Sequence, residues 1–151
     1  LAFNQGKITQ IGSVFVTFAA LLEKTRMTQT IKPVSSHALA DVIVSGLQER
    51  KGKEIKVLDL KNIGNTVCDY FVVCHGTSST HVESLAKSVE DEVRKVLNEK
   101  PFHKEGVGNA EWILLDYFDV VVHIFQESTR EFYNLEELWA DAVITSVEED
   151  Y

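Results

Sequence analysis

Hydrophobic residues follow two different periods along the chain. From Ser35 to about Lys51, and again from Ser78 to Pro101, apolar residues recur every three or four positions, as on the buried face of a helix. Other segments are short apolar runs rich in Val, Ile, Tyr and Phe, which are typical of strands. These strands are predicted at 54–60, 70–74, 112–117 and 120–125, with a brief additional strand near Phe102.

Capping and breaking residues predict where the helices begin and end. Ser35 and Ser36 are N-cap candidates for the first helix, and Gly52 is its predicted stop. Pro101 is predicted to end the long second helix. Near the C-terminus, two capping boxes predict one broken helix or two short ones: Ser128 with Glu131, and Asn134 with Glu137.

The order of these elements predicts the fold class. A helix, two strands, a long helix, further strands and a terminal helix follow one another without a repeat or an interdomain linker. This order is typical of a single α/β domain in which a mixed β-sheet is packed with helices. We expect the domain to span residues 34–142 and to be followed by a solvated acidic tail at 143–151.

Two acids interrupt the apolar run LLDYFDVVVHIF. On one continuous strand, Asp116 and Asp119 would face opposite sides of the sheet and could not act as a pair. If the chain instead reverses at Phe118 and Asp119, both acids lie at the tip of a hairpin, where Asp is a favoured residue. We predict the hairpin. A tight turn that required positive φ at Phe118 would cost about 1–2 kcal/mol, which another turn type or a bulge would avoid.

Composition and charge limit the possible partners. The 151 residues are 44% hydrophobic and 25% charged, as in ordinary folded proteins. The net charge of -8 disfavours direct nucleic-acid recognition, which needs a basic face, and suits a basic protein partner. Two cysteines provide no disulfide framework, so a reducing compartment, the cytoplasm, is expected.

The first 26 residues differ from the rest. They carry three bases and one acid, a net charge of +2, so the remaining residues carry −8 − 2 = −10. The apolar stretch from Ile11 to Leu22 is too short to cross a bilayer as a helix. Met27 is the only methionine. We therefore expect the native protein to start at Met27, with residues 1–26 a non-native or disordered extension.

No set of residues predicts a metal, a cofactor or a catalytic group. Cys68, Cys74, His75 and His81 do not have the spacing of a tetrahedral zinc site. The GTSS segment lies between a strand and a helix, where backbone N–H groups can face a phosphate, but the Lys of a phosphate-binding loop is absent. There is no G-x-S-x-G elbow for a serine nucleophile.

Three ordered segments resemble the ribosomal silencing factor RsfS, or iojap-like, family. They are VLDLKNIGNTVCDYFVVCHGTSSTHVESLA, EWILLDYFDVVVHIF and STREFYNLEELW, and the resemblance covers about Val34 to Asp141. The chain departs from the family at Phe118, where many members have Gly. This departure puts the geometry of the turn in doubt.

The resemblance implies a protein without enzymatic activity. Members bind the large ribosomal subunit through its protein fourteen (uL-fourteen), block its joining with the small subunit and repress translation, and organellar relatives act in large-subunit biogenesis. The implied fold is nucleotidyltransferase-like without the catalytic carboxylates. In such enzymes a strand carries D-x-D, whereas here Asp91 and Glu92 are adjacent residues of the predicted long helix.

The matching motifs also imply partner-binding residues. We expect contacts with the ribosomal protein at Asp69, Tyr70, Trp112, Asp116, Asp119, His123, Arg130, Tyr133, Leu135 and Trp139. Two alternatives remain open. One is a nucleotide-binding, nucleotidyltransferase-like protein, and the other is an adaptor that forms a homodimer through an edge strand.

Overall fold

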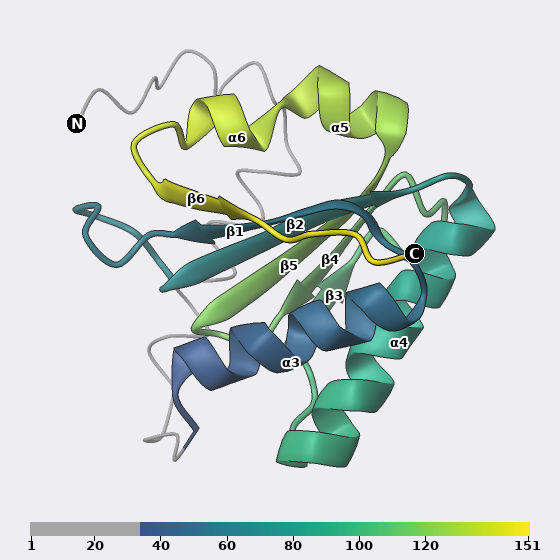
Figure 1. The fold of residues 1–151 in the computed structure, drawn as a ribbon, viewed down its shortest axis with the longest axis horizontal. Coiled ribbons are helices and arrows are strands. Elements are labelled where there is room, and N and C mark those ends of the chain that lie inside the picture. Colours follow the sequence, from purple (N-terminus) through teal and green to yellow (C-terminus); the bar gives the residue numbers. More distant parts are fainter. Residues whose placement is uncertain (1–33) are drawn as a thin grey trace.

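The fold is one six-stranded sheet with helices on both faces (Figure 1). The computed structural model describes residues 34–151, so the predicted extension at 1–26 and the predicted start at Met27 lie outside the described residues. None of the described helices is long and apolar enough to cross a membrane. In chain order the elements are α3 (Ser36–Glu49), β1 (Lys53–Asp59), β2 (Tyr70–Gly76), α4 (Ser79–Leu97), β3 (His103–Glu105), β4 (Trp112–Asp116), β5 (Val120–Gln126), α5 (Glu127–Tyr133), α6 (Leu135–Leu138) and β6 (Val143–Ser146).

The sheet is mixed, as predicted. Its strands lie in the order β3-β4-β5-β2-β1-β6. Neighbouring strands are antiparallel except β2 and β5, which run parallel with Val72 opposite Val122. The central strands β2 and β5 are buried on both faces, which explains why their sequences are continuous apolar runs rather than alternating ones.

Two hydrophobic layers cover the two faces of the sheet. Helices α3 and α4 pack on one face, over residues such as Val72, Ile113 and Val122. Helices α5 and α6 and the segment before β2 cover the other face, over Phe71 and Leu114. The strand alternation therefore assigns consecutive residues to different layers.

The helix ends differ from the predictions in two places. The long helix α4 ends at Leu97, before Pro101, because Asn98 adopts a left-handed conformation and closes the last turn through its N–H. Helix α5 begins at Glu127, directly after β5, with Gln126 in the N-cap position. Ser128 is therefore inside the first turn rather than at its cap, and the predicted capping box with Glu131 is wrong.

The second predicted capping box is also corrected by the structure. Asn134 has a left-handed backbone, ends α5 and precedes α6, but its side chain makes no bond to the helix backbone. Instead its amide nitrogen donates to the Glu137 carboxylate at 2.7 Å. The prediction of two short terminal helices is confirmed. At their junction, a hydrogen bond between two side chains replaces the predicted capping box.

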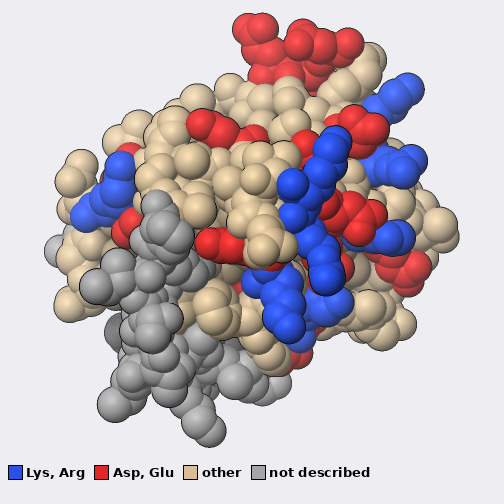
Figure 2. Space-filling model, turned by 90° about the horizontal axis from the view of Figure 1, so that it is seen from below, with Lys and Arg blue, Asp and Glu red and all other residues tan. Residues whose placement is uncertain are grey.

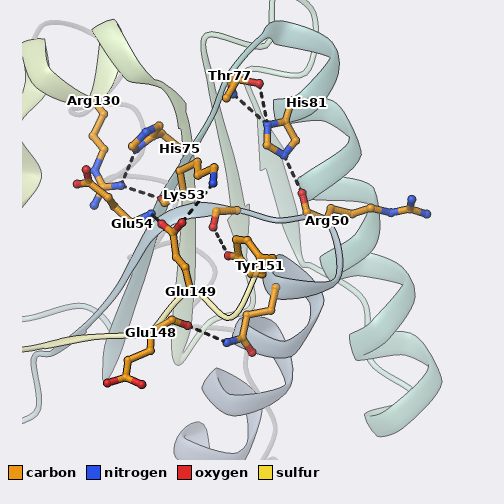
Figure 3. A network of polar contacts seen from close by, with 12 residues as sticks. Arg50, Lys53, Glu54, His75, Thr77, His81, Arg130, Glu148, Glu149 and Tyr151 are labelled. Atoms are coloured by element: carbon orange, nitrogen blue, oxygen red, sulfur yellow. Dashed lines mark hydrogen bonds and ion pairs between the residues drawn. The ribbon is translucent and has the colours of Figure 1, made fainter.

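The predicted C-terminal tail contains a strand, β6, although nearly all of its side chains are exposed. Residues of β6 pair with the outer edge of β1, with Ser146 opposite Lys56. Beyond β6, the Glu149 carboxylate accepts hydrogen bonds from the Glu54 N–H at 2.7 Å and the Lys53 amine at 3.2 Å (Figure 3). The Tyr151 hydroxyl donates to the Gly52 carbonyl. The strand pairing and the contacts of Glu149 and Tyr151 therefore connect this segment to the domain beyond residue 142.

The hairpin between β4 and β5 is confirmed, and its turn is strained. Phe118 has φ of 79°, and the Asp119 N–H donates to the Tyr117 carbonyl at 3.1 Å, which makes a three-residue γ-turn. Phe118 is buried, with its ring edge-on to Phe102. The Asp116 carboxylate accepts from the Phe118 N–H at 2.7 Å and holds the turn.

The turn predicts an unusual order of stability for substitutions at Phe118. Burial of the ring contributes about 1.5–3 kcal/mol, and positive φ costs a non-glycine residue about 1–2 kcal/mol. We expect Phe118→Gly, which relieves the strain, to lower the free energy of unfolding by about 1 kcal/mol. Phe118→Ala keeps the strain and should be about 1 kcal/mol less stable than Phe118→Gly. Urea denaturation measures both, and an alanine variant that is the more stable of the two would contradict the strained turn.

Candidate protein-docking surface

The ten predicted partner-binding residues form two groups in the structure. One group surrounds the β4–β5 turn, where the Asp119 carbonyl accepts hydrogen bonds from the N–H groups of Asp69 and Tyr70. The other group lies on the side of the sheet covered by α5 and α6: Trp112, His123, Arg130, Tyr133, Leu135 and Trp139.

The group at the turn mainly holds the hairpin against β2. Asp116 is 1% exposed, and one of its oxygens is used by the Phe118 N–H. Tyr70 is buried, with the Lys61 amine 4.9 Å from the centre of its ring. Asp69 and Asp119 are half-buried. Only these last two side chains therefore present part of their surface at this end of the sheet.

The second group contains a cluster of packed aromatic rings. The Trp112 indole N–H donates to Nδ1 of His123 at 3.2 Å. The Trp112 ring lies 4.8 Å from the Tyr133 ring, and Phe71 contacts both His123 and Trp139 edge-on. His123 is fully buried, and burial lowers its pKa to about 3, so the ring is neutral at physiological pH.

Arg130 joins four elements of the fold. Its guanidinium donates to the Glu136 carboxylate at 2.9 Å, to Nδ1 of His75 at 3.0 Å and to the Lys53 carbonyl at 3.3 Å. Figure 3 shows Arg130 and His75 directed toward each other beside the start of β1. Because an arginine only donates, Nδ1 of His75 accepts and this histidine is neutral. Burial and the Arg130 charge both lower the pKa of His75.

Most of the ten predicted residues therefore pack inside the domain, beneath its surface. Seven of the ten are buried, and Asp69, Asp119 and Tyr133 are half-buried. Position within a motif does not separate residues that hold a surface from residues that touch a partner. Direct partner contact at these ten residues stays a prediction.

Among the residues that the structure describes, the most exposed aromatic side chain belongs to Phe132, which is not one of the ten predicted residues. Phe132 on α5 is 77% exposed, and its ring meets the edge-on ring of Tyr133. Exposed acids lie on the same two helices. We call this set the α5–α6 surface: Glu127, Glu131, Phe132, Tyr133 and Glu137. The sequence offers a signal for this residue, because Phe132 is a large apolar side chain directly next to Glu131 in a segment rich in acids.

The α5–α6 surface has a strongly acidic charge balance. Residues 127–142 carry five acids and one base, a net of 1 − 5 = −4. The one base, Arg130, is 6% exposed and paired with Glu136. An exposed aromatic side chain among acids is suited to a basic protein partner, since aromatic residues supply contact area and acids orient the encounter.

The opposite side of the molecule is electrostatically mixed. Figure 2, which views the side of α3 and α4, shows Lys and Arg side chains interspersed with Asp and Glu. The ion pairs there include Lys87 with Asp91 and Lys95 with Glu92. Among the residues that the structure describes, the basic side chains on this face therefore lie next to acidic ones, which weakens the attraction for a phosphate backbone.

The GTSS loop is tied to His81 by two hydrogen bonds. The Thr77 N–H donates to Nδ1 of His81 at 3.0 Å, and the His81 N–H donates to the Ser78 hydroxyl at 3.1 Å. Nε2 of His81 lies 2.7 Å from the Arg50 carbonyl, which ties the loop to the end of α3. A phosphate would have to displace these contacts. Within residues 34–151, no group of three or more acidic, histidine or cysteine side chains is placed to hold a metal ion.

Comparison with known proteins assigns the family. The family described as "Ribosomal silencing factor during starvation" matches residues 33–150. The ribosomal silencing factor RsfS of Halalkalibacterium halodurans is 35% identical over 118 residues, which are 76% of this chain and 97% of that protein. The mouse protein "Mitochondrial assembly of ribosomal large subunit protein 1" is 30% identical over 101 residues, 66% of this chain and 44% of that protein.

A solved structure has the same fold. The crystal structure of a Chromobacterium violaceum protein superposes with a TM-score of 0.67 at 27% sequence identity. The match covers 78% of this chain and 97% of that one. The sequence motifs, the mixed sheet with its helical layers and these similarities lead to one conclusion: the chain belongs to the ribosomal silencing factor RsfS family.

Proposed function

We propose that this protein is a ribosomal silencing factor that docks on the large ribosomal subunit through its protein fourteen. The bound domain hinders the small subunit from joining and so represses translation in the cytoplasm. The observation that carries this proposal is the exposed Phe132 within the acidic α5–α6 surface, which the buried Arg130 network holds in place. The family name and the ribosomal name of the mouse relative support it, and the latter also favours a role in large-subunit biogenesis.

The proposed mechanism is steric and needs no catalytic step. The acids nearest to a nucleotidyltransferase signature, Asp91 and Glu92, lie on α4 and pair with lysines of the same helix. In the GTSS loop, the Thr77 N–H donates to His81 and the Ser78 hydroxyl accepts from the His81 N–H, so both groups are used inside the protein. Occupation of the subunit interface by a rigid domain is sufficient to block joining, because two bodies cannot occupy one surface.

The proposal predicts that Phe132 is an anchor for the large subunit. The wild-type protein should pellet with purified large subunits and not with small subunits, and it should reduce their joining. Phe132→Ser removes an exposed ring without opening a core cavity, and should weaken pelleting at least tenfold, because a central aromatic contact is commonly worth 2 kcal/mol or more.

The matched control is Val96→Ser, which also removes an exposed apolar side chain, on α4 at the opposite side of the sheet. Its pelleting should equal that of the wild type. Equal weakening by both substitutions would place the docking surface elsewhere. Failure of the wild-type protein to pellet with large subunits at moderate salt would overturn the proposed function and favour the nucleotide-binding alternative.

A further inference from the structure

A small hollow opens between β1, the end of β2 and the two short helices α5 and α6. Its volume is about 220 Å³. This is below the roughly 300–1,000 Å³ of typical pockets for drug-sized ligands, and it suits a single side chain better than a nucleotide. We call it the Glu pocket, and it is lined by Glu54, Lys56, His75, Glu127, Arg130, Glu131, Asn134 and Glu136.

The lining of the Glu pocket has an excess of negative charge. Four glutamates face two bases, a net of 2 − 4 = −2. Arg130 and Glu136 neutralise each other in an ion pair. The carboxylates of Glu54, Glu127 and Glu131 form no ion pair and accept no hydrogen bond from the other residues that the structure describes. Three carboxylates therefore remain available, against one amine of Lys56.

An irregularity in β1 sets the direction of the Glu54 side chain. The β1–β2 pairing shifts register between Lys53 and Lys56, and Glu54 has φ of 46°. Its N–H is held by the Glu149 carboxylate at 2.7 Å (Figure 3). A bulge of this kind redirects a side chain relative to a regular strand, and here the redirected side chain lines the pocket.

His75 contributes a hydrogen-bond donor to the same pocket. The residue is 8% exposed, and its Nδ1 accepts from Arg130 at 3.0 Å. The proton of the neutral ring is therefore on Nε2. This N–H has no acceptor among the described residues and is open to solvent at the pocket, so an occupant can reach it. An occupant of the pocket that carries a hydrogen-bond acceptor would give this N–H a partner.

We propose that the Glu pocket binds the guanidinium or ammonium group of a basic side chain on the ribosomal protein partner. The cation is held by Glu54, Glu127 and Glu131, and the His75 N–H donates to a peptide carbonyl beside that side chain. This inference rests on the proposed function and specifies the chemistry of its contact. An anion is disfavoured because the three available carboxylates outnumber the one available base.

The direct test uses a small probe in place of the partner. The imidazole NMR signals of His75 are followed in the full chain while N-acetyl-L-arginine methylamide is added. The neutral citrulline analogue has the same shape without the charge. The arginine probe should shift the His75 signals with a millimolar Kd, the citrulline probe should not, and Glu127→Gln/Glu131→Gln should abolish the shift. Equal shifts by both probes, no shift by either, or a larger shift by inorganic phosphate would overturn the proposal.

A second measurement separates this proposal from the proposed function. In the large-subunit pelleting assay, Glu127→Gln/Glu131→Gln should weaken binding about tenfold. The control Glu49→Gln/Glu83→Gln changes the net charge equally on exposed residues of α3 and α4 and should bind like the wild type. Normal pelleting of the pocket variant would overturn the Glu pocket while leaving the proposed function in place. Absence of pelleting by the wild type would overturn the function itself.

Discussion

Arg130→Gln will lower the free energy of unfolding by about 3 kcal/mol. The guanidinium is 6% exposed and bonds to Glu136, His75 and the Lys53 carbonyl, so its loss leaves a poorly solvated carboxylate and a carbonyl without their donor. Breaking a buried ion pair on one side commonly costs about 3–5 kcal/mol. Urea denaturation followed by far-UV circular dichroism measures the change.

A double-mutant cycle tests the cause of that loss. Glu136→Gln removes the charge that Arg130 leaves unpaired, so the double variant Arg130→Gln/Glu136→Gln should lose less stability than the sum of the single variants. Arg94→Gln serves as the surface control, because Arg94 is exposed on α4 and should change stability by less than about 0.5 kcal/mol. Additive losses would show that Arg130 and Glu136 act independently, against the network described above.

Acid will destabilise the protein below about pH 6.5, and His123 will account for a measurable part of the effect. In the folded state burial holds the His123 pKa at about 3, whereas the unfolded chain titrates near 6.5. Between these values the unfolded state binds one more proton, so stability falls as pH decreases, on the order of 1 kcal/mol per pH unit. Above pH 6.5 neither state is protonated and this contribution is constant. His75, whose pKa is also lowered, acts in the same direction.

His123→Gln isolates this contribution. The amide oxygen of glutamine can still accept from the Trp112 indole, but the side chain does not titrate. Unfolding free energies at pH 7, 6, 5 and 4 should therefore show a smaller slope for the variant, by about one proton. His37→Gln is the surface control, since the His37 side chain is 72% exposed on α3, and it should change the free energy of unfolding at pH 7 by less than about 0.5 kcal/mol. A slope in His123→Gln equal to the wild type would contradict a neutral, buried His123.

Elements with strong local signals were predictable from the sequence. The stripe of α4, the Ser35 and Ser78 caps, and the apolar runs of β2 and β5 each depend on residues near one another in the chain. The mixed sheet follows from the order of these elements. The hairpin was predictable from Asp119, although the strained γ-turn at Phe118 was not, because its cost is offset by burial of the ring.

The remaining features depend on contacts between distant segments. β6 forms because β1 offers it a free edge, and Glu149 is held by an N–H and an amine from β1. Nothing in the segment SVEEDY alone indicates these partners. For the candidate site, the sequence predicted which segment of the chain is involved but not which of its side chains are exposed. Motif matching identified the residues around α5 and α6, but only the structure distinguishes buried Arg130 and Trp139 from exposed Phe132.

The pairing of β6 with β1 has a consequence for synthesis of the chain. β1 leaves the ribosome long before β6, so during translation its outer edge presents unpaired N–H and C=O groups with no strand to accept them. Among the described strands, the first in chain order is therefore completed by the last. Chains that stop before Val143 will expose that edge permanently and will be prone to intermolecular β-association, so termination just before β6 will cause aggregation rather than yield a slightly shortened protein.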